Sequence, residues 1–535
     1  IAEAMDSLTE EQIAALNMER FDAICAALNA PMMVAEGETH IHYLCGGDEC
    51  NKVGHTETDK VTFKAWEETS ALPKAVGNYY LMNDVTLSSE YWDHDNGVVL
   101  CLNGHTITVE AKDSGIIVGN GKTFTLCDCK DSGKITHGTD SNGEKYDGRG
   151  VDVSQGTFNM YGGSITGNTA NTGAGVSMYN GTFNMYGGSI TGNEAKNLTT
   201  NSDNVGIGGG VYMEQNSTFN MYDGTISNNT GEYGGGVNIN SKSVFNMRGG
   251  TIRGNTTNTY GGGVYVGWNF NMIGGEITGN GAAKYGGGVY VESAYGNMGH
   301  FTVSGSAKVS GNNTSNVYLP DGATMAIGQG GFDNNASIGV TTEKSPAQGS
   351  YVAIATGADG DYKDGTFTDD QNTGGCKFQQ VGDQILLVNG TLHQHPICGN
   401  TCDHDSEHAN VAWKGVSSLS EITTGGYYYL TQDIEQTQTW NLPDAKVVLC
   451  LNGYNITAKA NVDVIKTSNY EQFILTDCMG GKMEYGKITH KEGSAGRGIY
   501  VNNSFIMYGG EISGNTADAP SASKKGYGGG VYVYD

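Results

Sequence analysis

Basic residues are scarce in this sequence. Lys and Arg together number 30 against 57 Asp plus Glu, which gives a formal net charge of −27. Nucleic acids and anionic membrane surfaces are both bound through basic patches, so this balance argues against either as a partner. It suits a soluble, self-repelling extracellular surface, which could also take up divalent cations such as Ca²⁺.

Long hydrophobic runs are missing as well. No stretch of apolar residues reaches the length needed to span a membrane. No signal peptide opens the chain, which begins at Ile1 rather than at Met. We therefore expect no membrane span in this sequence and interpret it as a mature or excised part of a longer protein.

The chain lacks the short motifs of the common enzyme classes. A P-loop, a nucleophile elbow and the order of a catalytic triad are all absent. Outward acids in the repeats occur singly, whereas glycoside hydrolases need two facing carboxylates and lyases need acidic calcium ligands. Arg149 and Arg497 recur, as do Asp128 and Asp477, but we expect turn or ladder roles for them. We predict that the chain is no enzyme. The alternative is a carbohydrate-active enzyme, a polysaccharide lyase or glycoside hydrolase with its acids on loops.

Glycine is abundant, with 83 residues, and much of it falls in a repeat. The phrase FNMYGGSITGN begins at Phe158 and returns four times before it degrades, with copies starting at Phe183, Phe219, Phe245, Phe270 and Phe301. A second phrase, GGGVYV or a close relative, lies between the copies. A fixed period of this size is typical of a solenoid, whose unit buries its apolar face only when a neighbour stacks on it.

Apolar and polar residues alternate within each copy, which indicates strands. Roughly 25 residues hold three short strands and three turns, the content of one coil of a parallel β-helix. Stacked in register, the copies would place Phe on Phe, Met on Met and Ile on Ile inside, with Asn on Asn at one turn from Asn168 to Asn312. Parallel crossovers are overwhelmingly right-handed. We therefore predict an all-β fold, a right-handed parallel β-helix with three short strands per coil.

The whole pattern occurs twice, with Arg149 of the first copy matched by Arg497 of the second. We predict an N-terminal capping helix in 1–36, a Cys/His metal-binding segment in 37–58, β-helix module 1 in 59–320, irregular terminal coils and a β cap in 321–390, a second Cys/His segment in 391–410, and a truncated module 2 in 411–535. The helix has a capping box from Ser7 to Glu10. Its alternative is the last helix of an upstream domain.

A segment rich in Cys and His precedes each module. HIHYLCGGDECNKVGH begins at His40, and HQHPICGNTCDHDSEH begins at His393. Cys and His at such short spacings can surround a tetrahedral Zn²⁺. The predicted ligands are His42, Cys45, Cys50 and His55 in the first segment, and His395, Cys398, Cys402 and His408 in the second. A closed set of four ligands leaves no open position, so both zinc sites would be structural.

Other interpretations of these cysteines stay open. His40, His393 and His404 would be neighbouring or competing ligands. Each segment could instead hold a local disulfide, such as Cys45 to Cys50, or be a solvated polar linker.

Two further cysteines recur between the modules, because Cys101 aligns with Cys450 and Cys129 with Cys478. We expect small buried thiols at these positions. The alternative for Cys101 is a bridge to the next coil.

Tyrosines and asparagines recur at outward positions. The candidate glycan-binding residues are Tyr161, Tyr186 and Tyr222 on one stripe and Tyr212, Tyr265 and Tyr290 on another, beside an Asn stripe from Asn159 to Asn271. Aromatic faces next to amides suit the stacking and hydrogen bonding of a sugar chain. The alternative is that Tyr and Asn stack on their own kind and stabilise the outer face.

The combination of HxHxxCG, LCLNGHTIT, LCDC and FNMYGGSITGN with GGGVYV resembles a family of large secreted or wall-attached proteins of Gram-positive intestinal bacteria. The likeness extends from about Ala30 onward. It implies tandem right-handed parallel β-helix modules, similar in fold to pectate-lyase-like and autotransporter-like β-helices. It also implies an extracellular location, secreted or attached to the cell wall, with adhesion as the expected role. It adds no catalytic residue.

These observations together predict a non-catalytic surface protein that acts as an adhesin, stalk or filament subunit. Its partners would be host or bacterial glycans, surface proteins or neighbouring copies of itself. The alternatives are the carbohydrate-active enzyme and a filament formed by self-assembly alone.

Overall fold

The computed structural model describes residues 40–45, 60–88, 91–112, 114–143, 145–198, 206–293, 299–358, 362–371, 375–398, 411–517 and 528–534. The regular secondary structure of these residues is almost entirely β-strand, with two short 3-10 helices, η1 (Leu419–Glu421) and η2 (Met479–Gly481). No helix in this part is long and apolar enough to cross a membrane. The helix predicted in 1–36 lies outside the described residues.

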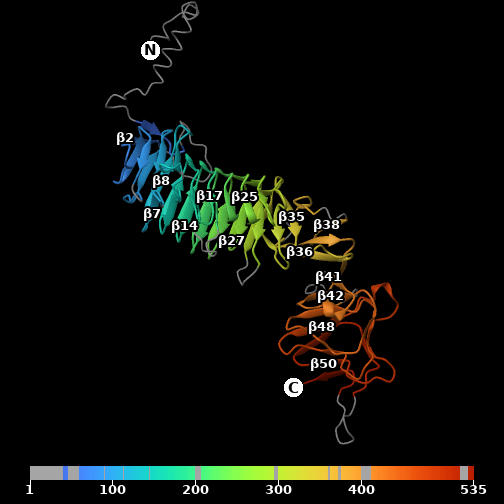
Figure 1. Cartoon of the computed structure of the whole chain (residues 1–535). Coiled ribbons are helices and arrows are strands. Elements are labelled where there is room, and N and C mark those ends of the chain that lie inside the picture. Colours follow the sequence, from blue (N-terminus) through green and yellow to red (C-terminus); the bar gives the residue numbers. More distant parts are fainter. Residues whose placement is uncertain are drawn as a thin grey trace, which may run out of the picture.

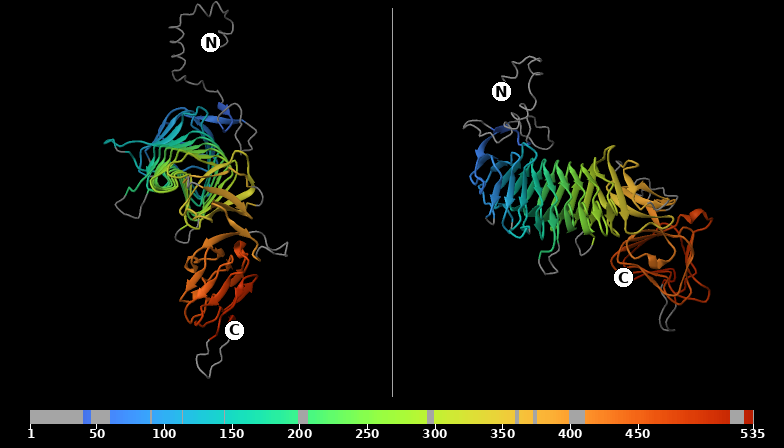
Figure 2. Two further views of the ribbon diagram at one scale, coloured as in Figure 1. Left: turned by 90° about the vertical axis from the view of Figure 1, so that its right-hand side faces the viewer. Right: turned by 45° about the horizontal axis from the view of Figure 1, so that its top comes forward.

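One coil of module 1 shows how the repeat folds. It contains β10 (Val151–Ser154), β11 (Thr157–Met160), β12 (Ser164–Thr166) and the two-residue β13 (Thr169–Ala170). Each strand pairs in parallel with its counterpart in the next coil, as Phe158 does with Phe183. The predicted parallel β-helix is therefore confirmed, and Figures 1 and 2 show its coils stacked along one axis. The middle coils add a short fourth strand to the three that the sequence predicts.

The strands of module 1 form three sheets. The first sheet contains β1 (His40–His42), β2 (Val61–Trp66), β3 (Gly77–Leu81), β5 (Val98–Cys101), β8 (Thr123–Cys127), β11, β15 (Thr182–Met185), β19 (Thr218–Met221), β23 (Val244–Met247), β27 (Asn269–Met272), β31 (His300–Gly305), β34 (Met325–Phe332), β36 (Ser350–Thr356), β39 (Gln384–Asn389) and β38 (Cys376–Val381). The second contains β4 (Val85–Leu87), β6 (Thr106–Val109), β7 (Ile116–Gly119), β9 (Lys134–His137), β10, β12, β14 (Val176–Tyr179), β16 (Ser189–Thr191), β18 (Val211–Glu214), β20 (Thr225–Ser227), β22 (Val237–Ile239), β24 (Thr251–Arg253), β26 (Val264–Val266), β28 (Glu276–Thr278), β30 (Val289–Val291), β32 (Lys308–Val309), β33 (Val317–Leu319), β35 (Ser337–Thr342) and β37 (Phe367–Asp369). The third contains β13, β17 (Glu194–Ala195), β21 (Thr230–Tyr233), β25 (Thr256–Tyr260) and β29 (Gly281–Ala282).

Module 2 repeats this construction in fewer coils. Its sheets contain β40 (His393–His395), β41 (Val411–Val416), β42 (Gly426–Leu430), β45 (Val447–Cys450), β48 (Gln472–Thr476) and β51 (Ser504–Met507); β43 (Ile434–Gln436), β46 (Ile456–Ala458), β49 (Lys487–His490) and β52 (Glu511–Ile512); and β44 (Trp440–Asn441), β47 (Ile465–Lys466), β50 (Ile499–Val501) and β53 (Val531–Val533). The two modules have separate hydrophobic cores. Module 2, in orange and red, follows the end of module 1 (Figure 1).

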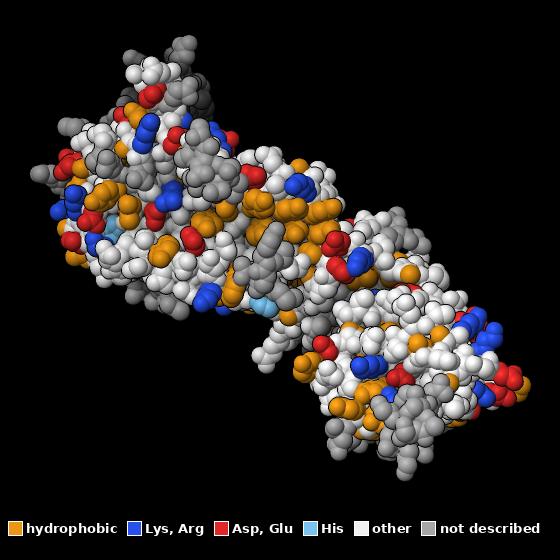
Figure 3. Space-filling view, turned by 60° about the horizontal axis from the view of Figure 1, so that its bottom comes forward, with side chains coloured by type: hydrophobic (Ala, Val, Ile, Leu, Met, Phe, Trp, Pro, Cys, Tyr) orange, Lys and Arg blue, Asp and Glu red, His pale blue; other side chains and the backbone are white. Residues whose placement is uncertain are grey.

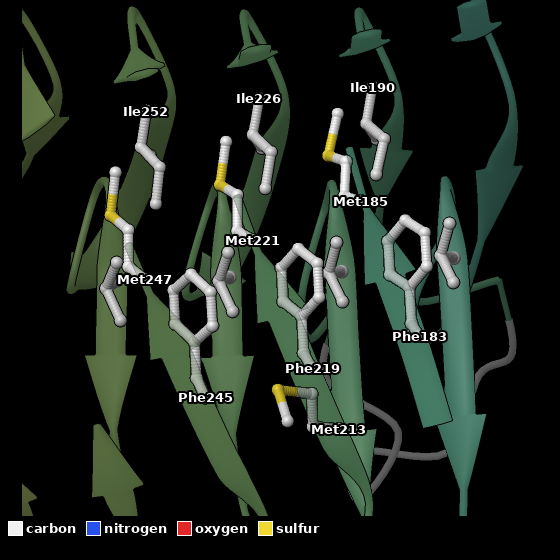
Figure 4. Packing of buried hydrophobic residues seen from close by; sticks show 14 of the residues in the cluster. Phe183, Met185, Ile190, Met213, Phe219, Met221, Ile226, Phe245, Met247 and Ile252 are labelled. Atoms are coloured by element: carbon white, nitrogen blue, oxygen red, sulfur yellow. The ribbon is translucent and has the colours of Figure 1, made fainter. Parts of the chain in front are cut away.

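The core of module 1 is a set of identical side chains stacked along the axis. The rings of Phe183, Phe219 and Phe245 have centroids 4.7 and 4.6 Å apart and are nearly parallel. Met and Ile form ladders beside them (Figure 4), and these side chains are fully buried. Stacking in register places each of these apolar side chains beside its counterparts in the neighbouring coils, so each coil buries its apolar face against the next. The predicted ladders are confirmed.

A buried ladder of asparagines follows one turn of the helix. The side-chain amide of Asn193 donates to the side-chain oxygen of Asn229 at 2.9 Å, and Asn229 donates in the same way to Asn255. Each oxygen also accepts a backbone N–H, and each amide also reaches a backbone carbonyl, such as that of Ile190 for Asn229. Buried polar groups are stable only when they are paired, and this ladder pairs them along the axis.

Candidate metal centres

Two histidines lie on β1, the strand at the edge of the first sheet of module 1. β1 pairs antiparallel with β2, so that His40 lies opposite Phe63 and His42 opposite Val61. Alternate residues of a strand point to one face, and both imidazoles therefore lie over the outer face of the first sheet. His40 stacks on Tyr80 with ring centroids 4.2 Å apart, and His42 stacks on Phe63 at 4.3 Å.

Two cysteines from the following coils reach the same face. Cys101 is the last residue of β5 and packs in the outer cluster with Tyr80, not in the main core. Cys129 follows β8 in a turn that is held by the carboxylate of Asp128, which accepts the backbone N–H of Gly104 at 2.7 Å. Asp477 holds the corresponding turn of module 2. The turn role predicted for the two aspartates is confirmed.

These four residues, His40, His42, Cys101 and Cys129, form centre 1. One ligand atom from each lies within 4.8 Å of all the others. The sulfurs of Cys101 and Cys129 are 3.6 Å apart, and His40 Nε2 lies 3.4 Å from the Cys129 sulfur and 4.0 Å from that of Cys101. Ligand atoms around a tetrahedral Zn²⁺ are separated by roughly 3.3–3.8 Å, given the usual metal–ligand bond lengths. The side chains are thus close to the positions that a four-coordinate cation requires.

The ring orientation of His42 favours a cation as well. Its Nδ1 lies 2.5 Å from the carbonyl oxygen of Tyr43, an acceptor, so Nδ1 carries the proton and donates it. Nε2 is then left with a lone pair. That atom is buried and has no hydrogen-bond partner in the described part of the chain. A backbone bond at one ring nitrogen and a metal at the other is the usual arrangement of a histidine ligand.

The thiols of centre 1 keep their protons when no cation is bound. The pKa of Cys101 is raised, chiefly by its hydrogen bond with Cys127. The pKa of Cys129 is raised to about 11 by its hydrogen bond with Cys101 and by burial. Cations bind the thiolate form, so binding here would release protons.

Centre 2 repeats this geometry in module 2 with His393, His395, Cys450 and Cys478. The two sulfurs are 3.4 Å apart, and His393 Nε2 lies 3.2 Å from the Cys478 sulfur. His395 Nδ1 lies 2.6 Å from the Pro396 carbonyl, and its Nε2 is again buried without a hydrogen-bond partner among the described residues.

Aromatic rings hold the histidines of centre 2 in place. His393 stacks on Tyr429 at 4.1 Å and His395 on Trp413 at 4.3 Å, and the Trp413 indole N–H donates to the His395 carbonyl. Burial raises the pKa of Cys450, whereas the hydrogen bond from Cys450 and the nearby imidazoles lower that of Cys478. The same four-residue arrangement is therefore built twice in one chain.

The structure brings some of the predicted ligands together and not others. His42 and His395 belong to the two centres. Cys45 and Cys398 are disulfide-bonded, which corrects their assignment, because a disulfide sulfur has no thiolate to offer a cation. The remaining predicted ligands, Cys50, His55, Cys402 and His408, lie outside the described residues. His40 and His393, expected as neighbours or competitors, are members of the centres.

Sequence reasoning assigned Cys101, Cys129 and their counterparts to packing rather than to a metal. None of the four forms a disulfide in the described part of the chain, so Cys101 is not bridged to the next coil. A signal for their role was present, because these cysteines recur in both modules whereas Cys127 is replaced by Thr476 at the equivalent strand position. Recurrence of two thiols together with two histidines is the pattern of a shared site rather than of core filling.

The tyrosines predicted to bind glycans stack mainly on one another. Tyr161 and Tyr212 are buried, with 7% and 8% of their surface exposed, which corrects their prediction as outer binding residues. Tyr161 stacks on Tyr186 at 4.6 Å, and Tyr186 stacks on Tyr222 at 4.8 Å. The rings of Tyr265 and Tyr290 are stacked in the same way at 5.6 Å. Their faces pack on one another, so few ring faces remain for a sugar.

The outer Asn stripe is paired in the same way. The amide of Asn184 donates to Asn159 at 2.9 Å, and the pattern continues to Asn271. Stacking on their own kind thus describes these amides better than ligand binding. Side chains of the hydrophobic class, in which Tyr is included, gather in a band on the surface of module 1 (Figure 3).

No protein-family model matches the chain, and no curated protein or solved structure resembles it at a significant level.

Proposed function

We propose that this chain is a non-catalytic extracellular rod, a stalk, adhesin or filament subunit made of tandem β-helix modules, each clamped at its start by one structural zinc ion. The observation that carries the proposal is that β-helix and metal centre recur together. In both modules a two-histidine strand is brought over two cysteines from successive coils. A chain that repeats a whole module with its clamp extends a rod, whereas a catalytic site needs to occur only once.

The donor set supports zinc. Two imidazole nitrogens and two sulfurs at tetrahedral spacing suit Zn²⁺, and four protein ligands leave no position for substrate. Ca²⁺ takes oxygen ligands, so these centres do not fit Ca²⁺. The bound ion would tie His40 and His42 to Cys101 and Cys129, and thereby join the first strand to the following coils.

The surroundings of the site support an extracellular location. Cys45 and Cys398 are disulfide-bonded, and disulfides persist mainly in oxidising compartments. Free thiols in such a compartment are protected when a metal ion binds them. We therefore place the rod outside the cell, secreted or attached to the wall.

Acids on the outer surface support a non-catalytic role. Asp152 pairs with Arg149 at 2.7 Å, and Glu194 pairs with Lys196 at 3.0 Å. The first pair is partly buried and the second is exposed, and single ion pairs of this kind are ordinary features of a protein surface. The two facing carboxylates of a glycosidase would be a different arrangement.

Two measurements test the proposal. A mass spectrum of the intact chain under native conditions is expected to show two bound zinc ions. Incubation with host glycans and plant polysaccharides is expected to yield no new reducing ends and no unsaturated sugars. Cleavage products would overturn the non-catalytic assignment, and a metal-free mass would overturn the zinc clamp.

A further inference from the structure

Centre 2 lies where the two modules meet. Module 1 ends in an antiparallel cap of β36, β39 and β38. β39 ends at Asn389 and β40 begins at His393, so three residues, Gly390 to Leu392, separate the cap from the first ligand of centre 2. The connection between the modules therefore leads directly into the metal centre.

Two hydrogen bonds cross the joint. The Tyr429 hydroxyl of module 2 donates to the Gly349 carbonyl of the module 1 cap at 3.3 Å. The Tyr351 hydroxyl of the cap donates to the Ala412 carbonyl of module 2 at 3.2 Å. Gly349 has a φ of +72°, a backbone conformation that favours glycine at this turn before β36.

An apolar contact accompanies these bonds. Leu386 and Val388 of the cap and Ala412 of module 2 form one buried cluster, and Leu392 of the connection packs against it. The joint is small, and contacts of this size between domains permit relative motion unless something else restrains it.

Both bonds lie next to ligands of centre 2. Tyr429 stacks on His393. Ala412 precedes Trp413, which stacks on His395 and donates to its carbonyl. Any change in the position of the two histidines is therefore transmitted to the groups that hold the cap.

We propose that cation binding at centre 2 stiffens the joint between the modules. Without a cation, β40 is held by a three-residue antiparallel ladder with β41 and by ring stacking. A cation adds bonds from β40 to Cys450 and Cys478, which belong to two successive coils of module 2. It fixes the end of the connection and the Tyr429 ring, which donates one of the two hydrogen bonds. It also fixes Trp413, the neighbour of Ala412, whose carbonyl accepts the other bond. This inference rests on the proposed zinc clamp and assigns the clamp at centre 2 a second role.

Centre 1 provides the matched control. Tyr80 stacks on His40 as Tyr429 does on His393, but β3, which contains Tyr80, lies at the opposite end of the first sheet from β36. Removing a ligand from centre 1 should thus cost a metal ion without loosening the joint.

The test compares Cys450→Ser with Cys101→Ser in the full chain. Each variant is expected to bind one zinc ion instead of two. Small-angle scattering should show a wider spread of distances between the modules for Cys450→Ser alone. Proteolysis between β39 and β40 should become about tenfold faster for that variant, because cleavage follows the open population. Equal scattering and equal cleavage for the two variants would overturn the inference.

A second pair of variants covers the outcome that Cys450→Ser fails to fold. Tyr429→Phe removes the bond to Gly349 and keeps the ring on His393, and Tyr80→Phe is its counterpart at centre 1. Both should keep two zinc ions, and only Tyr429→Phe should cleave faster at the connection. No difference between them would refute the inference while leaving the zinc clamp intact. A wild-type chain without zinc would instead refute the clamp itself.

Discussion

At the scale of single residues, stability comes from repetition of one environment. A phenylalanine such as Phe219 is fully buried and touches the same residue type above and below it. Stacked aromatic pairs add about 0.5–1.5 kcal/mol each to the free energy of burial. Loss of one ring therefore affects two contacts and leaves a cavity that the neighbouring coils cannot fill.

Phe219→Ala is expected to lower the free energy of unfolding by about 3–5 kcal/mol, the usual cost of removing a buried ring. Urea unfolding of the chain measures this change. Tyr179→Ala is the control in the same module, because Tyr179 is 47% exposed and its loss should change stability by no more than about 0.5 kcal/mol. Similar values for the two variants would contradict the buried ladder.

The two asparagine ladders should differ in their energetic weight. Asn229→Ala removes the partner of the Asn193 amide and of the Ile190 carbonyl, both buried, at about 1–3 kcal/mol for each unpaired group. Asn220→Ala affects only the half-buried outer ladder, where water can replace the lost partner. Urea unfolding of both variants is the measurement. A larger loss of unfolding free energy for Asn220→Ala than for Asn229→Ala would contradict the burial of the ladder that contains Asn229.

At the scale of elements, β1 and β40 are held on their modules by side-chain contacts as much as by backbone pairing. Each pairs with its neighbour over three residues, and a short edge strand gains little stability from such a ladder. The cluster of two histidines and two cysteines links each strand to the coils beyond its neighbour. A bound cation therefore contributes most where the strand ladder is shortest.

Zinc stoichiometry separates the structural ligand set from the one predicted from local spacing. Cys129→Ser should reduce the zinc count from two to one, because it removes a thiolate of centre 1. Cys45→Ser should keep both ions, because Cys45 is disulfide-bonded. Cys127→Ser is the matched control, since Cys127 is buried beside Cys101 and is no member of the centre. Native mass spectrometry measures the zinc count of all three variants. Loss of zinc in Cys45→Ser would instead support the ligand set predicted from the spacing within one segment.

At the scale of the whole molecule, the chain consists of two solenoids with separate cores. In a solenoid each coil contacts only its neighbours, so stability is nearly a sum of local terms. The small contact between the cap and module 2 does not merge the two cores into one cooperative unit. Unfolding should therefore proceed in two steps rather than one.

Calorimetry of the zinc-loaded chain is expected to show two transitions. Cys101→Ser should lower the midpoint of one transition and Cys450→Ser that of the other, because each removes the clamp of a single module. A chelator should lower both midpoints. A single transition that responds equally to both substitutions would contradict the independence of the modules.

The sequence alone determined the solenoid and its internal ladders. FNMYGGSITGN repeats with Phe, Met, Ile and Asn at constant offsets, and parallel pairing in register leaves only one way to stack such copies, with Phe183 beside Phe219. The turn roles of Asp128 and Asp477 followed from their recurrence in the same way. These features depend on short-range order along the chain, which a single sequence displays directly.

Only the tertiary structure decided which residues form the metal centres. Local spacing suggested that one short segment supplies all four ligands, yet Cys101 and Cys129 lie 61 and 89 residues from His40 in the sequence. Coil stacking brings them together, because successive coils are only about 4.8 Å apart along the axis. The burial of Tyr161 and Tyr212 was decided in the same way, by neighbours that belong to other coils. Contacts between coils depend on the register of the strands and on the face to which each side chain points. The spacing of residues within one segment determines neither of these.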